Sequence, residues 1–176
     1  MAYTFKNTKY LLIHSILLTF LVLHLVSCNK TSKSSSRPPE KVKSSGESGK
    51  VKTVLSTARS YIGTKYKYGG CSRNGIDCSG LVYTSFKSAN IDLPRTSSAQ
   101  STSGKSVKLE DIQPGDLVFF TDKKGNKKVT HVGIVTEVKG AKAVKFIHAS
   151  TKLGVVENNL FAEYYISIFL KAVRVL

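Results

Sequence analysis

The 176-residue chain has room for one domain of ordinary size and little more. Its 27 lysine and arginine residues outnumber 11 aspartate and glutamate residues, which gives a net charge of +16 at pH 7. Such a charge favours anionic partners. No DNA- or RNA-binding motif accompanies the basic residues, so nucleic acid is excluded as an expected partner.

Residues 1–27 have the order of features that is typical of a secretory signal peptide. Lys6 and Lys9 form a basic start, residues 11–26 are almost all apolar, and Ser27 is the small residue expected before a cleavage point. The apolar run is shorter than the roughly 20 residues that span a bilayer. We therefore expect cleavage after Ser27, with an uncleaved membrane anchor as the alternative.

The segment Leu25-Val26-Ser27-Cys28 resembles the bacterial lipobox, in which the cysteine is acylated and becomes the new N-terminus. Acyl chains on Cys28 would anchor the protein stably, because each buried methylene contributes about 0.8 kcal/mol. Residues 28–50 are rich in Ser, Lys, Pro and Gly and predict a flexible, basic tether. We expect a lipid-anchored protein of the bacterial cell envelope, on the periplasmic side and at the outer membrane rather than the inner one. The basic tether suits anionic lipid head groups or wall polymers.

The folded domain is predicted over residues 51–176 and begins with helices. Apolar residues at helical spacing predict a first helix over 51–62, and Gly63 stands where a C-terminal cap belongs. A Gly-rich loop follows. Asp77 has the side chain of an N-cap, so Cys78 is expected in the first turn of a second helix.

The hydrophobic pattern becomes strand-like in the second half of the domain. A short helix is expected over 96–103. Beyond it, four runs rich in Val, Ile and Phe are separated by turn residues and predict strands over 116–121, 130–138, 143–150 and 168–176. Helices followed by an antiparallel sheet make an α+β domain, in which the N-terminal helices pack on the C-terminal sheet.

Cys78 is the candidate nucleophile. The reactive form of a cysteine is the thiolate, and the ordinary pKa is about 8.5. The partial positive charge at a helix N-terminus stabilises the anion, and a neighbouring imidazole stabilises it further and can return the proton to a leaving amine. We therefore expect the pKa of Cys78 to be lowered and a histidine to lie beside it.

His131 and His148 are the candidate partners, because hairpin geometry brings them together. A two-residue turn at 139–140 puts them directly opposite each other, and a four-residue loop at 139–142 makes them diagonal neighbours. Side chains alternate with period two, so both registers leave the pair on one face of the sheet, whereas an odd-length or bulged loop would not. His131 is the expected general base and His148 the third member that orients it.

Tyr66 and the backbone N–H of Cys78 are the expected donors to a developing oxyanion. With these residues, six motifs occur in the order found in the NlpC-type cell-wall peptidases, and the chain resembles that family over nearly all of residues 51–176. The motifs are Tyr66-Lys67-Tyr68-Gly69-Gly70, Asp77-Cys78-Ser79-Gly80, Leu93-Pro94-Arg95-Thr96-Ser97 with Gln100, Pro114-Gly115-Asp116-Leu117-Val118-Phe119-Phe120, His131-Val132-Gly133-Ile134 and Phe146-Ile147-His148-Ala149-Ser150. The close of the chain, residues 172–176, resembles the Spr-like lipoprotein members.

The resemblance implies a papain-like fold and hydrolysis of D,L-amide bonds in peptidoglycan stem peptides or their cross-links. It assigns the nucleophile, the base and the third residue to Cys78, His131 and His148. The family residues that line the substrate cleft correspond to Tyr66, Asp77 and Ser79. The resemblance implies no metal and no organic cofactor, and we expect a monomer that binds peptidoglycan peptides.

Several alternatives stay open at this point. Cys71 stands where the family more often has Ser or Thr, and it could be a packed thiol or form an inactivating disulfide with Cys78. The two thiols and two histidines could also hold zinc, although the close Cys-x-x-Cys spacing is missing. The reaction could be acyl transfer or amidase chemistry on the same fold, or the domain could be a non-catalytic wall-binding lipoprotein. Arg95 is expected to be a structural hydrogen-bonding residue near the cleft. Residues 161–170 lack the basic residues of similar proteins.

Overall fold

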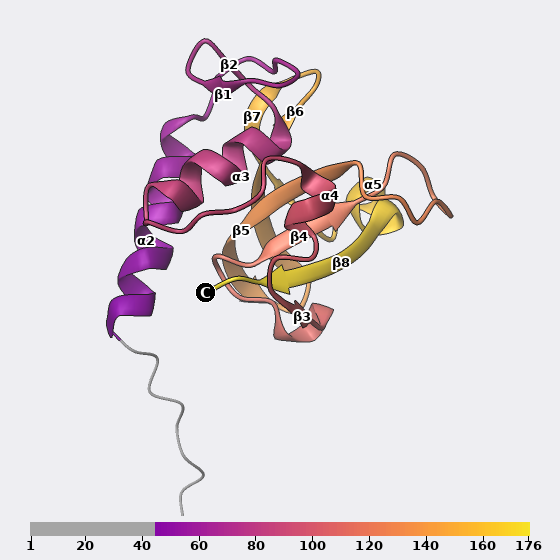
Figure 1. The fold of residues 1–176 in the computed structure, drawn as a ribbon. Coiled ribbons are helices and arrows are strands. Elements are labelled where there is room, and N and C mark those ends of the chain that lie inside the picture. The colour runs from indigo at the N-terminus through magenta and orange to yellow at the C-terminus, as the bar shows by residue number, and fades with distance from the viewer. Residues whose placement is uncertain (1–44) are drawn as a thin grey trace, which may run out of the picture. The chain divides into compact units, whose positions relative to one another are not determined.

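The computed structural model of the protein describes residues 45–176. The predicted signal peptide, Cys28 and most of the predicted tether lie outside these residues. Helix α2 spans Ser45–Ser60 and therefore begins six residues before the predicted start at Val51 (Figure 1). Within residues 45–176, no helix is both long and apolar enough to cross a membrane.

Two helices cover one face of the sheet. The second of them, α3, spans Cys78–Lys87, and it packs against both α2 and strands of the sheet (Figure 1). Val54 and Ala58 of α2 and Leu81 of α3 are fully buried, as their helical spacing predicts. The expected short helix is shorter than predicted, because α4 spans only Ser97–Gln100.

Six antiparallel strands form the main sheet in the order β3-β8-β4-β5-β6-β7. Their bounds are Lys105–Val107 (β3), Leu117–Phe120 (β4), His131–Gly140 (β5), Ala143–Ser150 (β6), Gly154–Asn159 (β7) and Phe169–Arg174 (β8). A separate short pair, β1 (Cys71–Ser72) and β2 (Gly75–Ile76), precedes α3. The prediction of an α+β domain with helices before an antiparallel sheet is confirmed.

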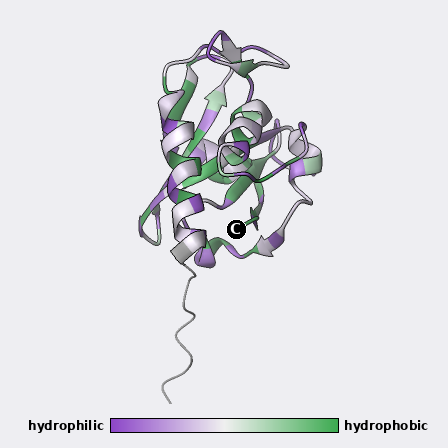
Figure 2. Ribbon diagram, turned by 60° about the vertical axis from the view of Figure 1, so that its left-hand side comes forward, coloured by the Kyte–Doolittle hydropathy of each residue, from purple (hydrophilic) through white to green (hydrophobic). Residues whose placement is uncertain are grey.

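Both faces of the main sheet are buried. Side chains alternate along β4, so Leu117 and Phe119 join the core beneath α2 and α3, whereas Val118 and Phe120 join a second core on the opposite face. Helix α5, Glu163–Ile168, contributes to the second core. Figure 2 shows hydrophobic residues concentrated along the strands, as expected for a sheet that is covered on both sides.

Near the two histidines, the β5–β6 hairpin has the register predicted for a four-residue loop at 139–142, and not the one predicted for a two-residue turn at 139–140. The turn lies at residues 141–142, between the paired residues Gly140 and Ala143, and not at 139–140. Two register shifts then follow along β5, and beyond them Ile134 pairs with Ile147. Because two shifts of one residue leave every side chain on its original face, the two histidines keep the shared face that was predicted.

Six elements were not predicted: β1, β2, β3, β7, α5 and the 3-10 helix η1 (Leu109–Asp111). The sequence of β7, Gly-Val-Val-Glu-Asn-Asn, ends in polar residues and lacks the alternation of a half-buried strand. Helix α5 has only six residues. Strand β7 and helix α5 supply two side chains to the site described next.

Candidate active site

Asp77 caps the helix that carries Cys78. Its φ of −98° and ψ of 175° are extended, and its Oδ1 accepts a hydrogen bond of 2.6 Å from the backbone N–H of Gly80. Cys78 is therefore the first residue of α3, as predicted, and it is only 8% exposed. The N-cap fixes where the chain turns and hence where the thiol lies.

The Cys78 thiol lies beside the first residues of β5. Burial raises the pKa of Cys78 and is the largest influence. Hydrogen bonds from the backbone N–H groups of Val132, Ser79 and Cys78 itself lower it, and the charge of Asp77 raises it again, so the pKa stays above its ordinary value. The prediction of a lowered pKa is wrong, because the sequence shows the helix start and not the depth at which it is buried. Burial thus favours the neutral thiol of Cys78 over the thiolate in the free protein.

His131 and His148 are hydrogen bonded to each other. The distance from His131 Nε2 to His148 Nδ1 is 2.8 Å, and the rings are nearly perpendicular at 88°. Burial lowers the pKa of His131, and the proximity of His148 lowers it further. Burial also lowers the pKa of His148, although its hydrogen bond to Asn158 acts in the opposite direction. Both rings are therefore neutral at pH 7.

Two further side chains, which the sequence did not reveal, complete this hydrogen-bonded group. Asn158 Oδ1 lies 2.9 Å from His148 Nε2, and the Tyr165 hydroxyl donates to the same oxygen at 3.0 Å. The Tyr165 hydroxyl also lies 3.2 Å from His148 Nε2. Asn158 comes from β7 and Tyr165 from α5, two of the elements that sequence patterns missed. Nothing in the sequence of β7 distinguishes Asn158 from its polar neighbours Glu157 and Asn159, so the sequence carried no signal for it.

Arg95 holds the loop before α3 and the start of α3 together. Its guanidinium donates to Asp77 Oδ1 and Oδ2 at 2.9 and 2.8 Å, to the Ser79 hydroxyl at 2.9 Å and to the carbonyl oxygen of Gly70 at 2.9 Å. Burial raises the pKa of Asp77, but the bonds from Arg95 and from backbone N–H groups outweigh it and hold that pKa below its usual value. The predicted structural role of Arg95 is confirmed. Asp77 and Ser79 are themselves buried, at 6% and 7% exposure.

Tyr66 lies near the nucleophile on the loop before β1. It forms an isolated parallel bridge with Ile76, two residues before Cys78. Burial raises the pKa of Tyr66, and the nearby Cys78 and Asp77 raise it further, so the hydroxyl stays protonated and can donate a hydrogen bond. Tyr66 is half-buried and close enough to Cys78 for the charge of a thiolate there to raise the pKa of the Tyr66 hydroxyl.

Cys71 is an exposed free thiol on β1 and is not joined to Cys78. The alternative of a packed Cys71 thiol is therefore wrong. In the part of the chain that the structure describes, no three His, Cys, Asp or Glu side chains come together in a way that would hold a metal ion.

A buried cysteine at a helix N-terminus, a sheet that carries a histidine pair and an α+β layout together define the papain-like class of cysteine peptidase domains. The model of the NlpC/P60 family matches residues 63–174. The chain belongs to the NlpC/P60 family.

Three similar proteins illustrate this membership. The probable endopeptidase NlpC of Escherichia coli is 34% identical over 161 residues, which are 91% of this chain and 97% of that protein. The γ-D-glutamyl-L-lysine dipeptidyl-peptidase of Bacillus subtilis is 36% identical over 98 residues, 56% of this chain and 33% of that protein. The crystal structure of an NlpC/P60 family protein from Bacillus cereus is similar with a TM-score of 0.65 and 33% identity, over 72% of this chain and 40% of that chain.

Proposed function

We propose that the protein is a peptidoglycan endopeptidase that hydrolyses D,L-amide bonds of stem peptides or of their cross-links. One observation carries the proposal: the buried Cys78 at the start of α3 lies beside the start of β5, where His131 is hydrogen bonded to His148 at 2.8 Å. Similarity to endopeptidases of the NlpC/P60 family supports the substrate class.

The reaction begins from a neutral thiol and a neutral imidazole. His131 takes the proton of Cys78 as the sulfur attacks the scissile carbonyl carbon, and His148 holds the ring of His131 in place. The backbone N–H of Cys78 and the Tyr66 hydroxyl donate to the oxyanion. The proton then passes from His131 to the leaving amine, and the C–N bond breaks to leave a thioester. Water, deprotonated by His131, hydrolyses the thioester and restores the thiol.

Three residues are proposed to line the substrate cleft: Tyr66, Asp77 and Ser79. Of these, Tyr66 is half-buried and has a hydroxyl that can reach a substrate. The Asp77 carboxylate already accepts bonds from Arg95 and from backbone N–H groups, and the Ser79 hydroxyl donates to it at 3.1 Å. We therefore assign Asp77 and Ser79 to shaping the cleft wall, and Tyr66 to direct contact with the substrate.

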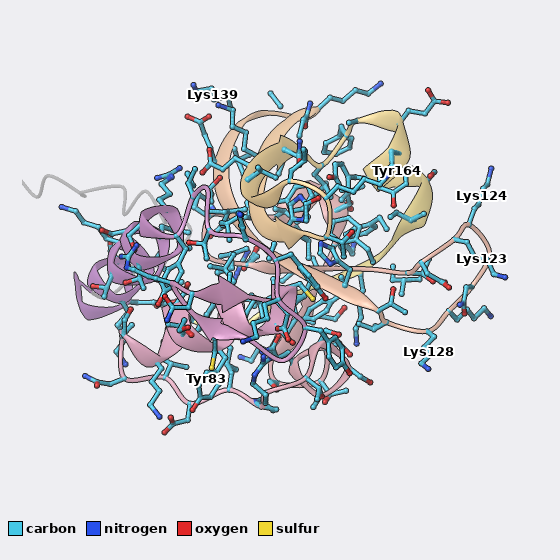
Figure 3. The ribbon with its side chains drawn as sticks, turned by 90° about the horizontal axis from the view of Figure 1, so that it is seen from above. Tyr83, Lys123, Lys124, Lys128, Lys139 and Tyr164 are labelled. Atoms are coloured by element: carbon cyan, nitrogen blue, oxygen red, sulfur yellow. The ribbon has the colours of Figure 1, made fainter. Side chains whose placement is uncertain are left out.

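The protein is proposed to work as a monomer at the cell envelope, with residues 1–27 as a signal peptide and Cys28 as the lipidated residue. Of the predicted tether over 28–50, residues 45–50 belong to α2, so the proposed tether is residues 28–44. Its positive charge supports attraction to the anionic wall. Within residues 45–176, a group of lysines in the loop between β4 and β5 forms no ion pair. They are Lys123, Lys124, Lys127 and Lys128, of which Figure 3 shows three on a loop that projects from the body.

Digestion of purified peptidoglycan tests the function. Wild-type protein should release muropeptides that mass spectrometry identifies, and the variants Cys78→Ala, His131→Ala and His148→Ala should release far fewer while remaining folded by circular dichroism. Cys71→Ala is the matched control and should retain activity. Full activity of Cys78→Ala would refute the assignment. Products that carry an added amine would favour acyl transfer, and wall binding without any release by the wild type would favour a non-catalytic wall-binding role.

A further inference from the structure

We propose that Asn158 and Tyr165 are positioning residues that set which nitrogen of each catalytic histidine carries a proton. The inference rests on the proposed peptidase function, because it concerns how the same histidine pair works. It is carried by a continuous chain of contacts from β5 through β6 and β7 to α5.

Asn158 Oδ1 ends this series of hydrogen bonds and determines which nitrogen donates in each of them. A carbonyl oxygen cannot donate, so Asn158 Oδ1, 2.9 Å from His148 Nε2, requires a proton on that nitrogen. Neutral His148 then has its lone pair on Nδ1, which accepts from His131 Nε2 at 2.8 Å. The proton of neutral His131 is thus on Nε2, and its Nδ1 is left free to accept the proton of Cys78.

Tyr165 is the second hydrogen-bond partner of the Asn158 amide. Its hydroxyl donates to Asn158 Oδ1 at 3.0 Å, so the amide oxygen that faces His148 Nε2 has partners on two sides. Since a hydroxyl can accept as well as donate, this bond stabilises the arrangement and does not by itself select it. With the amide reversed, its N–H would donate to His148 Nε2, and each bond in the chain would run the other way. His131 Nδ1 would then carry the proton and could not act as the base.

Aromatic packing holds this group rigid. The His148 ring is 2% exposed and stacks on Phe146, with ring centroids 4.9 Å apart and planes 21° apart. Tyr165 packs edge-on against Phe146 at 4.9 Å and against Phe120 at 5.8 Å. Neither His148 nor Tyr165 can rotate without disturbing the second core, so the hydrogen-bond directions are preorganised.

Asn158 is an uncharged hydrogen-bond acceptor, and the two histidines that it orients are uncharged as well. The titratable neighbours of His148 are His131 on β5 and Tyr165 on α5, and Cys78 on α3 lies beside the start of β5. Asn158 therefore fixes the proton positions without the negative charge that a carboxylate would add. An aspartate at this position would stabilise the imidazolium form and raise the pH at which the pair becomes protonated.

Three variants distinguish a role of Asn158 and Tyr165 in orienting the histidines from a role in packing alone. Tyr165→Phe keeps the ring and removes the hydroxyl, Asn158→Ala removes the acceptor, and Asn158→Asp adds a charge. Tyr164→Phe is the matched control, since Tyr164 is the neighbouring residue on α5 and is 64% exposed (Figure 3). We expect kcat to fall roughly tenfold in Asn158→Ala, a size typical of losing the partner that orients a functional histidine. Tyr165→Phe should show a smaller fall, and Asn158→Asp should move the acidic limb of the kcat profile to higher pH.

Nuclear magnetic resonance of ¹⁵N-labelled histidine reads the proton positions without any substrate. The wild type and Tyr164→Phe should show His148 and His131 both protonated at Nε2, and Asn158→Ala should show a mixture of tautomers. A His148 protonated at Nδ1 in the wild type would overturn the inference, as would unchanged tautomers and pH profiles in all three variants. If the wild type does not cleave peptidoglycan but shows the Nε2 tautomers, the proposed function fails and the positioning inference stands.

Discussion

Replacement of Arg95 by alanine tests how far the start of α3 depends on one guanidinium. The substitution removes four hydrogen bonds and leaves the carboxylate of Asp77, whose side chain is 8% exposed, without its cationic partner. Loss of one partner from a fully buried ion pair costs about 3–5 kcal/mol. The Arg95 side chain is 35% exposed, so water screens the pair. Because Asp77 also keeps its backbone N–H donors, we expect a loss of about 2 kcal/mol.

Arg59 offers a matched control for this prediction. It pairs with Glu157 at 2.9 Å, but the two side chains are 45% and 23% exposed. Arg59→Ala should therefore cost about 0.5 kcal/mol, the size typical of surface pairs. Arg95→Lys should be intermediate, since an ammonium group cannot reach Asp77, Ser79 and Gly70 together. Urea unfolding of the four proteins at pH 7, followed by circular dichroism, gives these differences.

The stability difference between the wild type and Arg95→Ala should depend on pH. The pKa of Asp77 is depressed in the folded state, so its contribution to stability is present above the unfolded pKa of about 3.9 and is lost as pH falls through the folded pKa. The difference between wild type and Arg95→Ala should therefore shrink below about pH 4. An Arg95→Ala variant as stable as Arg59→Ala at pH 7 would refute this account of the helix start.

Three further predictions concern the nucleophile, the sheet and the charged loop. Alkylation of Cys78 by iodoacetamide, followed by peptide mapping, should be slow at pH 7 and should become faster as the solution is made alkaline, because burial raises the pKa of the thiol. Rapid alkylation at pH 6 would contradict this prediction. Gly133→Ala should destabilise the fold by about 1–3 kcal/mol and lower activity, because a Cβ would lie 2.6 Å from the Phe146 ring. Gly140→Ala, where nothing lies within 4 Å, should be near neutral. Replacement of the four lysines of the β4–β5 loop by glutamine should raise KM for intact wall at low salt and leave kcat unchanged. As a control, glutamine at four lysines outside that loop should leave KM unchanged. The control positions are Lys105, Lys108, Lys139 and Lys142.

Local rules were enough to predict that Cys78 begins a helix and that His131 and His148 share one face of the sheet. The cap at Asp77 and the first helical position of Cys78 depend on neighbours in the sequence. The shared face of His131 and His148 depends only on strand alternation and an even offset. The turn lies at residues 141–142, within the 139–142 loop that was one of the two predicted alternatives. The offset stays even because two one-residue bulges in β5 add up to two residues.

Tertiary effects account for what the sequence did not show. The pKa of Cys78 is raised because α3 is buried against the sheet, a depth that no cap or spacing reveals. Asn158 and Tyr165 reach His148 from a strand without clear alternation and from a helix of six residues. Such short elements are stabilised by packing and carry little signal of their own.

The central claim is that Cys78 forms a thioester with the acyl part of a stem peptide. Acid quenching during turnover of a synthetic stem peptide, followed by proteolysis and mass spectrometry, tests it directly. We predict a mass increase equal to the acyl fragment on the peptide that contains Cys78, removable by hydroxylamine and absent from Cys78→Ala. An adduct on any other residue, or continued hydrolysis by Cys78→Ala, would contradict the account.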